Sequence, residues 1–103
     1  MTRWDISLPH NVRETTLEAT VESSIATCGL IVRLKTSLTT IPGSVHWHTG
    51  HSGQRGVLEI TLTPATRQIA LSTRRGRDAP WIPDMAPTLI KTILHMATTG
   101  NPA

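Results

Sequence analysis

Three histidines and a glutamate around one predicted β-hairpin have the types and spacing of a metal site. His46, His48 and His51 follow one another closely, and Glu59 lies on the next predicted strand. Imidazole nitrogens and carboxylate oxygens are common zinc ligands in proteins. Residues two apart on a strand project from the same face, so His46 and His48 direct their imidazoles to one point. The sequence therefore offers His46, His48, His51 and Glu59 as candidate metal ligands. It predicts no cofactor, and zinc is the one metal that it leaves open.

A simpler interpretation of these histidines stays open, in which they bind only water on an exposed sheet face. Metallo-hydrolases with a His-x-His-x-x-His pattern carry an acidic residue before the third histidine, whereas this chain has Gly50 there. Hairpin registers that keep Trp47 with the apolar residues place Glu59 opposite His46 or His48. A carboxylate at that position is expected to raise the pKa of the facing histidine.

Three arginines in one loop form the densest basic cluster of the chain. Arg74, Arg75 and Arg77 follow the third predicted strand, and the chain has a formal net charge of +3 and an isoelectric point near 10. Guanidinium groups bind phosphate and carboxylate through paired hydrogen bonds. A solvated loop that binds nothing is the alternative. The predicted ligand-binding residues are His46, His48, Glu59, Ser72, Arg74, Arg75 and Arg77.

These features favour a small non-catalytic binding domain for an anionic partner, with nucleic acid as one candidate. A metal- or histidine-dependent enzyme that uses His46, His48 and Glu59 is the alternative, so the sequence leaves catalysis open. The chain has no Phe or Tyr, which leaves few aromatic side chains for stacking on bases. The three glycines of the hairpin loop lack the Gly-Lys-Ser/Thr element of a phosphate-binding loop. No context marks a catalytic serine triad.

The elements that position these residues are three antiparallel strands across residues 44–74. Apolar and polar residues alternate on both sides of the glycine-containing loop, which is typical of a hairpin. A third strand returns after Pro64 and ends near Arg74. The residues expected to be buried on these strands are Leu58, Ile60, Leu62, Ile69 and Leu71.

Helices are expected on either side of the strands. Apolar residues at helical spacing favour a helix over residues 14–29, although several threonines leave a strand possible there. The same spacing predicts helix over residues 30–41, after a break at Gly29. A last helix is expected to begin near Trp81, with a buried stripe that includes Ile82, Leu89 and Ile93.

The resulting fold is a two-layer α+β domain. A three-stranded antiparallel sheet would have an N-terminal helical segment and a C-terminal helix packed on one face. The whole chain, residues 1–103, is predicted to form one domain, with an extended arm over residues 1–13 that could form an edge strand and a frayed tail over 98–103. The single cysteine, the absence of a signal-peptide pattern and the lack of a long apolar run predict a cytoplasmic protein without a membrane partner. The sequence does not indicate an oligomeric state.

One stretch resembles a group of small uncharacterised bacterial proteins. The shared residues are Ile41-Pro-Gly-Ser-Val-His-Trp-His, then Gly56-Val-Leu-Glu-Ile-Thr, and finally Arg75-Gly-Arg followed by Trp81. The resemblance covers roughly residues 41–81. It implies a bacterial protein but brings no activity, ligand or catalytic residue.

Overall fold

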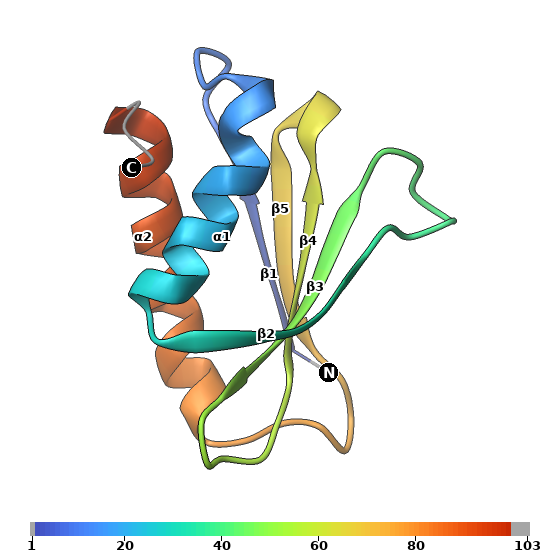
Figure 1. Cartoon of the computed structure of the whole chain (residues 1–103), viewed down its shortest axis with the longest axis vertical. Coiled ribbons are helices and arrows are strands. Elements are labelled where there is room, and N and C mark those ends of the chain that lie inside the picture. Colours follow the sequence, from blue (N-terminus) through green and yellow to red (C-terminus); the bar gives the residue numbers. More distant parts are fainter. Residues whose placement is uncertain (1, 100–103) are drawn as a thin grey trace.

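The computed structural model describes residues 2–99 as one antiparallel sheet with two α-helices on one face (Figure 1). The five strands lie in the order β1-β5-β4-β3-β2. The strands are β1 (Thr2–Ser7), β2 (Leu30–Thr36), β3 (Val45–His51), β4 (Leu58–Thr63) and β5 (Gln68–Thr73). The helices are α1 (Leu17–Thr27) and α2 (Trp81–Thr99), with short 3-10 helices η1 (Glu14–Thr16) and η2 (Pro64–Thr66).

The hydrophobic core lies between the sheet and the helices. Trp47 on β3 is fully buried there, together with Leu17 and Ile25 of α1 and Leu89 of α2. The prediction of three antiparallel strands across residues 44–74 is confirmed, since β3, β4 and β5 pair in this way. The residues predicted to be buried on these strands are all at most 1% exposed: Leu58, Ile60, Leu62, Ile69 and Leu71.

The number of strands was predicted wrongly, because the sheet has five strands rather than three. One additional strand is β1, which pairs with β5 at the edge of the sheet. Trp4 and Ile6 of β1 pack against the core. The expectation that the N-terminal arm forms an edge strand is therefore confirmed.

The other additional strand is β2, where the spacing of apolar residues predicted a helix. β2 pairs with β3, and the register shifts at an irregularity between Val32 and Leu34. An extra residue in a strand brings residues three apart onto the same face. Ile31 and Leu34 therefore lie opposite Gly50 and His48, which share one face of β3. The bulge reproduces helical spacing within a strand, and this is why the prediction of helix over residues 30–41 is wrong.

The predicted helix before Gly29 is confirmed. α1 ends at Thr27, and Gly29 has a φ of +74°, a left-handed conformation that glycine adopts without strain. The C-terminal helix begins at Trp81 as predicted and accommodates Pro87 within it. This helix includes residues 98 and 99 of the predicted tail, and the rest of that tail, residues 100–103, lies outside the described residues.

Within residues 2–99, neither helix is long and apolar enough to cross a membrane. The sheet therefore has one face covered by α1 and α2, and a second face on which neither helix packs (Figure 1). We call this second face the open face. It carries the polar residues that alternate with the buried rows of β3, β4 and β5.

Candidate metal centre

The strand register brings His46, His48 and Glu59 together on the open face. His48 lies directly opposite Glu59 on β4, and His46 lies opposite Thr61. Of the two registers left open by the sequence, the structure therefore has Glu59 facing His48. The metal-binding atoms of the three side chains all lie within 4.8 Å of one another, so this group could hold a metal ion.

The three atoms form a compact triangle. His46 Nε2 lies 3.1 Å from Glu59 Oε1 and 3.1 Å from His48 Nε2. The third side, from His48 Nε2 to Glu59 Oε1, is 3.6 Å. Zinc binds nitrogen and oxygen at about 2.0–2.1 Å in tetrahedral sites, which places any two ligands about 3.3 Å apart. The triangle therefore has the dimensions of one face of a zinc tetrahedron.

Hydrogen bonds among the three atoms of this triangle cannot pair all of their lone pairs. Two neutral imidazoles and a carboxylate are lone-pair acceptors at these atoms unless an Nε2 carries a hydrogen. A single N–H can align with only one side of the triangle, so lone pairs would still face one another along the others. A bound cation removes this repulsion because all three atoms then direct a lone pair at it.

Thr61 holds the His46 ring in an orientation that suits metal binding. Its Oγ1 lies 2.8 Å from His46 Nδ1. When Nδ1–H donates to this hydroxyl, Nε2 is unprotonated and free to bind a metal. Such outer contacts fix the tautomer of metal-binding histidines and increase their affinity. The sequence analysis gave Thr61 no role. The alternation Glu59-x-Thr61 opposite His46-x-His48 was the signal that could have identified it.

Glu59 is unusually buried for a carboxylate. Its side chain is only 3% exposed, and Arg74 Nε lies 2.9 Å from Oε2. This ion pair lacks the alignment of a hydrogen bond, so Oε2 has no hydrogen-bond partner within the part of the chain that the structure describes. Buried carboxylates are normally paired more fully than this. Arg74 therefore neutralises Oε2, and Oε1, which faces the two imidazoles, is the oxygen available to a metal ion.

Solvent reaches the centre from the side of His48. The His48 side chain is 20% exposed, compared with 6% for His46. Burial lowers the pKa of His48 below its ordinary value, and the nearby charges of His46, Arg77 and Arg74 lower it further. The charge of Glu59 acts in the opposite direction and is the second-largest influence, smaller only than burial. The expected rise in pKa is therefore wrong for His48, and the lowered pKa favours the neutral ring that a metal ion requires.

His51 is not part of the centre. Residues three apart on a strand point to opposite faces, so His51 lies on the other side of the sheet from His48. Its ring is 5.7 Å from the ring of Trp81, and its Nδ1 lies 3.4 Å from the carbonyl oxygen of Ser52. The histidine spacing therefore predicted two ligands correctly placed for a metal and one that is not.

The predicted anion-binding arginines lie near the centre, but only one contacts it. Arg74 pairs with Glu59, while Arg75 and Arg77 are exposed in the loop between β5 and α2. This loop is fixed to the loop between β3 and β4, because Val57 N–H donates to the carbonyl oxygen of Arg77. Trp81 Nε1 similarly donates to the carbonyl oxygen of Arg55. The arginine loop is therefore held beside the open end of the centre.

Two further residues complete the surroundings. Ser72 lies opposite Glu59 on β5, as part of the same open face. Arg33, which the sequence did not single out, extends over the open face above Gly50, where a Cβ would collide with its guanidinium group. The β2 bulge places Arg33 there. Because the apolar spacing predicted helix over residues 30–41, the sequence analysis did not place Arg33 on the sheet.

Comparisons with known protein families, curated proteins and solved structures found no match to this chain. The function is therefore inferred from the geometry of the site.

Proposed function

We propose that this protein binds a zinc ion through His46, His48 and Glu59 and uses it, together with neighbouring arginines, to bind an anionic ligand. The observation that carries the proposal is the triangle of His46 Nε2, His48 Nε2 and Glu59 Oε1, with sides of 3.1, 3.1 and 3.6 Å. Three protein ligands leave a fourth tetrahedral position for a molecule from solution.

The surroundings of that fourth position favour an anion. Arg74 lies at the centre with its side chain 63% exposed, so its terminal nitrogens remain accessible to a ligand. Arg77 is close enough for its charge to lower the pKa of His48. A metal cation and two guanidinium groups together attract phosphate or carboxylate.

Catalysis is a second candidate function. Two histidines and one glutamate are a ligand set found in catalytic zinc sites, where the fourth ligand is water. The exposure of His48 leaves such a water accessible to substrate. In this case the protein would be a metal-dependent hydrolase, and its activity would require the same three residues.

Zinc binding is tested by titration of the full chain, purified without a histidine tag and freed of metal. We expect one zinc per chain, and a Co²⁺ derivative with the visible absorption bands of tetrahedral coordination. His48→Ala should weaken zinc binding by more than the roughly 10–100-fold that loss of an outer contact costs. His95→Ala is the matched control, because His95 is exposed on α2 and outside the centre. Equal zinc affinity in both variants would overturn the proposal.

Thr61→Val provides a finer test of the same centre. The substitution preserves side-chain shape and all three ligands, but it removes the hydroxyl beside His46 Nδ1. We expect zinc affinity to fall about 10–100-fold, as is typical when an outer contact is lost. Thr88→Val on the exposed surface of α2 should leave the affinity unchanged. An unchanged affinity in Thr61→Val would show that the Thr61 contact does not orient the ligand.

The anion-binding part is tested with the variant Arg74→Ala/Arg75→Ala/Arg77→Ala. We expect weaker and less salt-dependent retention on heparin, since each lost phosphate or sulfate contact lowers the salt slope. Retention that is unchanged by the triple substitution would exclude these arginines as the anion-binding residues.

A further inference from the structure

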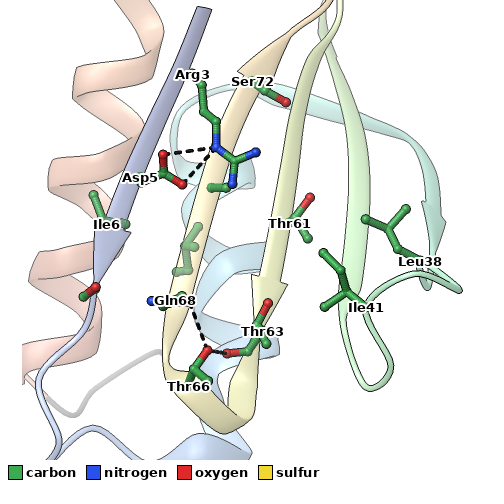
Figure 2. A pocket seen from close by; sticks show the side chains of 13 residues that line it. Arg3, Asp5, Ile6, Leu38, Ile41, Thr61, Thr63, Thr66, Gln68 and Ser72 are labelled. Atoms are coloured by element: carbon green, nitrogen blue, oxygen red, sulfur yellow. Dashed lines mark hydrogen bonds and ion pairs between the residues drawn. The ribbon is translucent and has the colours of Figure 1, made fainter.

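A pocket on the open face lies beside the candidate metal centre, although His46, His48 and Glu59 do not line it (Figure 2). Its volume is about 470 Å³, within the range of small-molecule sites in proteins. Thr61 belongs to both sites, because it contacts His46 and also lines the pocket. Ser72 lines the pocket as well and lies opposite Glu59 in the sheet. A ligand of the metal that is long enough to reach past Thr61 would therefore enter this pocket.

The floor of the pocket is rich in hydrogen-bonding groups. Thr61, Thr63, Gln68 and Ser72 come from the adjacent strands β4 and β5 and lie on the same face (Figure 2). Hydroxyl and amide side chains both donate and accept hydrogen bonds, which suits a ligand that carries several hydroxyl groups.

The wall of the pocket is apolar and preformed. Leu38 and Ile41 from the loop between β2 and β3 line this side (Figure 2). The loop is held by hydrogen bonds from Ile41 N–H to the Leu38 carbonyl oxygen, and from Leu38 N–H to Ser44 Oγ. A hydroxyl-lined floor with an apolar wall matches a sugar, which has hydroxyl groups at its edge and C–H groups on its faces.

The charge at the metal centre selects the anionic group. A zinc ion, the Glu59 carboxylate and the Arg74 guanidinium together carry a net charge of +2. A phosphate monoester carries about −1.5 to −2 at pH 7, whereas a carboxylate carries −1. Two residues along a strand span about 6.6 Å, so a phosphate beside Glu59 would place an attached sugar over Thr61 and direct its far end toward Thr63.

We propose that the open-face pocket binds a sugar phosphate, with the sugar on the Thr63–Ser72 floor and the phosphate at the metal centre. This inference rests on the proposed zinc site and specifies the class of its ligand. A polyanion such as nucleic acid is a different outcome, which the experiment distinguishes.

The experiment compares probes on the zinc-loaded full chain by calorimetry and by amide chemical shifts. The probes are ribose 5-phosphate, inorganic phosphate, ribose and a single-stranded oligonucleotide. We expect ribose 5-phosphate to bind at least tenfold more tightly than inorganic phosphate and to shift the amides of Leu38, Thr63 and Gln68. Equal affinity for the two phosphates, or shifts confined to the arginine loop, would overturn the inference. Tighter binding of the oligonucleotide than of ribose 5-phosphate would also overturn it.

The variant Thr63→Val/Gln68→Ala separates the pocket from the metal centre, because Thr63 and Gln68 face each other at the end of the floor away from Glu59. We expect it to bind ribose 5-phosphate no better than inorganic phosphate, while its zinc affinity stays that of the unmodified chain. Thr88→Val is the control and should retain the preference for the sugar phosphate. An unchanged preference in Thr63→Val/Gln68→Ala would contradict the pocket assignment.

Failure of the zinc site itself is recognised separately. If the chain binds no zinc, the proposed function fails, and the same probes are applied to the metal-free protein. Pocket amides that shift with ribose 5-phosphate and not with inorganic phosphate would still support the pocket as a sugar-phosphate site. Absence of such shifts would overturn it.

Discussion

Two glutamates on opposite faces of the sheet, both close to the β3 strand, have contrasting environments. Glu22 of α1 lies on the helix-covered face, where its Oε2 accepts a hydrogen bond of 3.1 Å from Trp47 Nε1 and lies 2.7 Å from Lys35 Nζ. Its side chain is 40% exposed. Glu59 on the open face is 3% exposed, and it faces two imidazoles and the side of one guanidinium group.

The difference separates a structural ion pair from a binding site. Glu22 has hydrogen donors and a cation, so its interactions are complete without any ligand. Lys35 also pairs with Glu18 at 2.5 Å, and these charges join α1 to β2. The acceptors around Glu59 instead lie close enough to one another to hold a metal ion. A buried polar cluster with too few donors is costly unless another group completes it.

The largest predicted effect concerns the core that supports both clusters. Ile60 lies between Glu59 and Thr61 on β4 and is fully buried. Ile60→Ala should lower the free energy of unfolding by about 2–5 kcal/mol, because it removes buried methylene groups and leaves a cavity. Ile31→Ala is the control, since Ile31 is 46% exposed, and it should change stability by at most about 0.5 kcal/mol. Urea denaturation of the metal-free protein measures both. Similar losses in the two variants would show that the core is assigned incorrectly.

The next prediction compares the two carboxylates directly. Zinc at 100 times its Kd should stabilise the unmodified chain by about 2.7 kcal/mol, because the ion binds the folded state. Glu59→Gln should remove most of this zinc-dependent gain, whereas Glu22→Gln should retain it. Thermal denaturation with zinc and with a chelator measures the gain. A loss of the zinc effect in Glu22→Gln, or its retention in Glu59→Gln, would reverse the contrast between the faces.

The placement of the site residues on the open face could be predicted largely from the sequence. The residue that was placed wrongly has a reason that lies in its own strand. Strict alternation placed His46, His48 and Glu59 on one face, and the strand pairing confirms it. His51 was included by spacing alone, although its odd offset from His48 directs it to the other face. The face of the sheet on which a residue lies follows from the two-residue alternation along its own strand. Contacts between segments far apart in the chain do not follow from that alternation.

The features of the fold that the sequence analysis predicted wrongly or did not predict depend on how distant segments pair and pack. The bulge near Arg33 gave β2 a helical spacing, so a sheet edge was interpreted as helix. The pairing of Glu22 with Trp47 and Lys35 joins residues that are up to 25 positions apart. The pKa of His48 depends on its burial more than on the facing carboxylate, and burial is a property of the whole fold.

The smallest predicted effect is a pH dependence confined to the helix-covered face. The hydrogen bond from Lys35 lowers the pKa of Glu22 below its usual value of 4.5, with help from the Trp47 N–H and the Lys35 charge, although burial opposes them. A carboxyl group whose pKa is lower in the folded state binds fewer protons when folded than when unfolded. Its stabilising contribution is therefore complete above about pH 4.5 and is lost as the pH falls through the folded pKa.

Glu22→Gln isolates this contribution, because the amide oxygen still accepts the Trp47 hydrogen bond but carries no charge. We expect the unmodified chain to be modestly more stable than Glu22→Gln above pH 4.5, with the difference shrinking at lower pH. The effect is small because both Glu22 and Lys35 are 40% exposed, so water and salt screen their charges. Urea denaturation of both proteins in chelator, from neutral pH to below pH 4, measures the difference without interference from metal at Glu59. A difference in stability that stays constant over this range would show that the Glu22 charge, unlike its hydrogen bond to Trp47, contributes nothing to the fold.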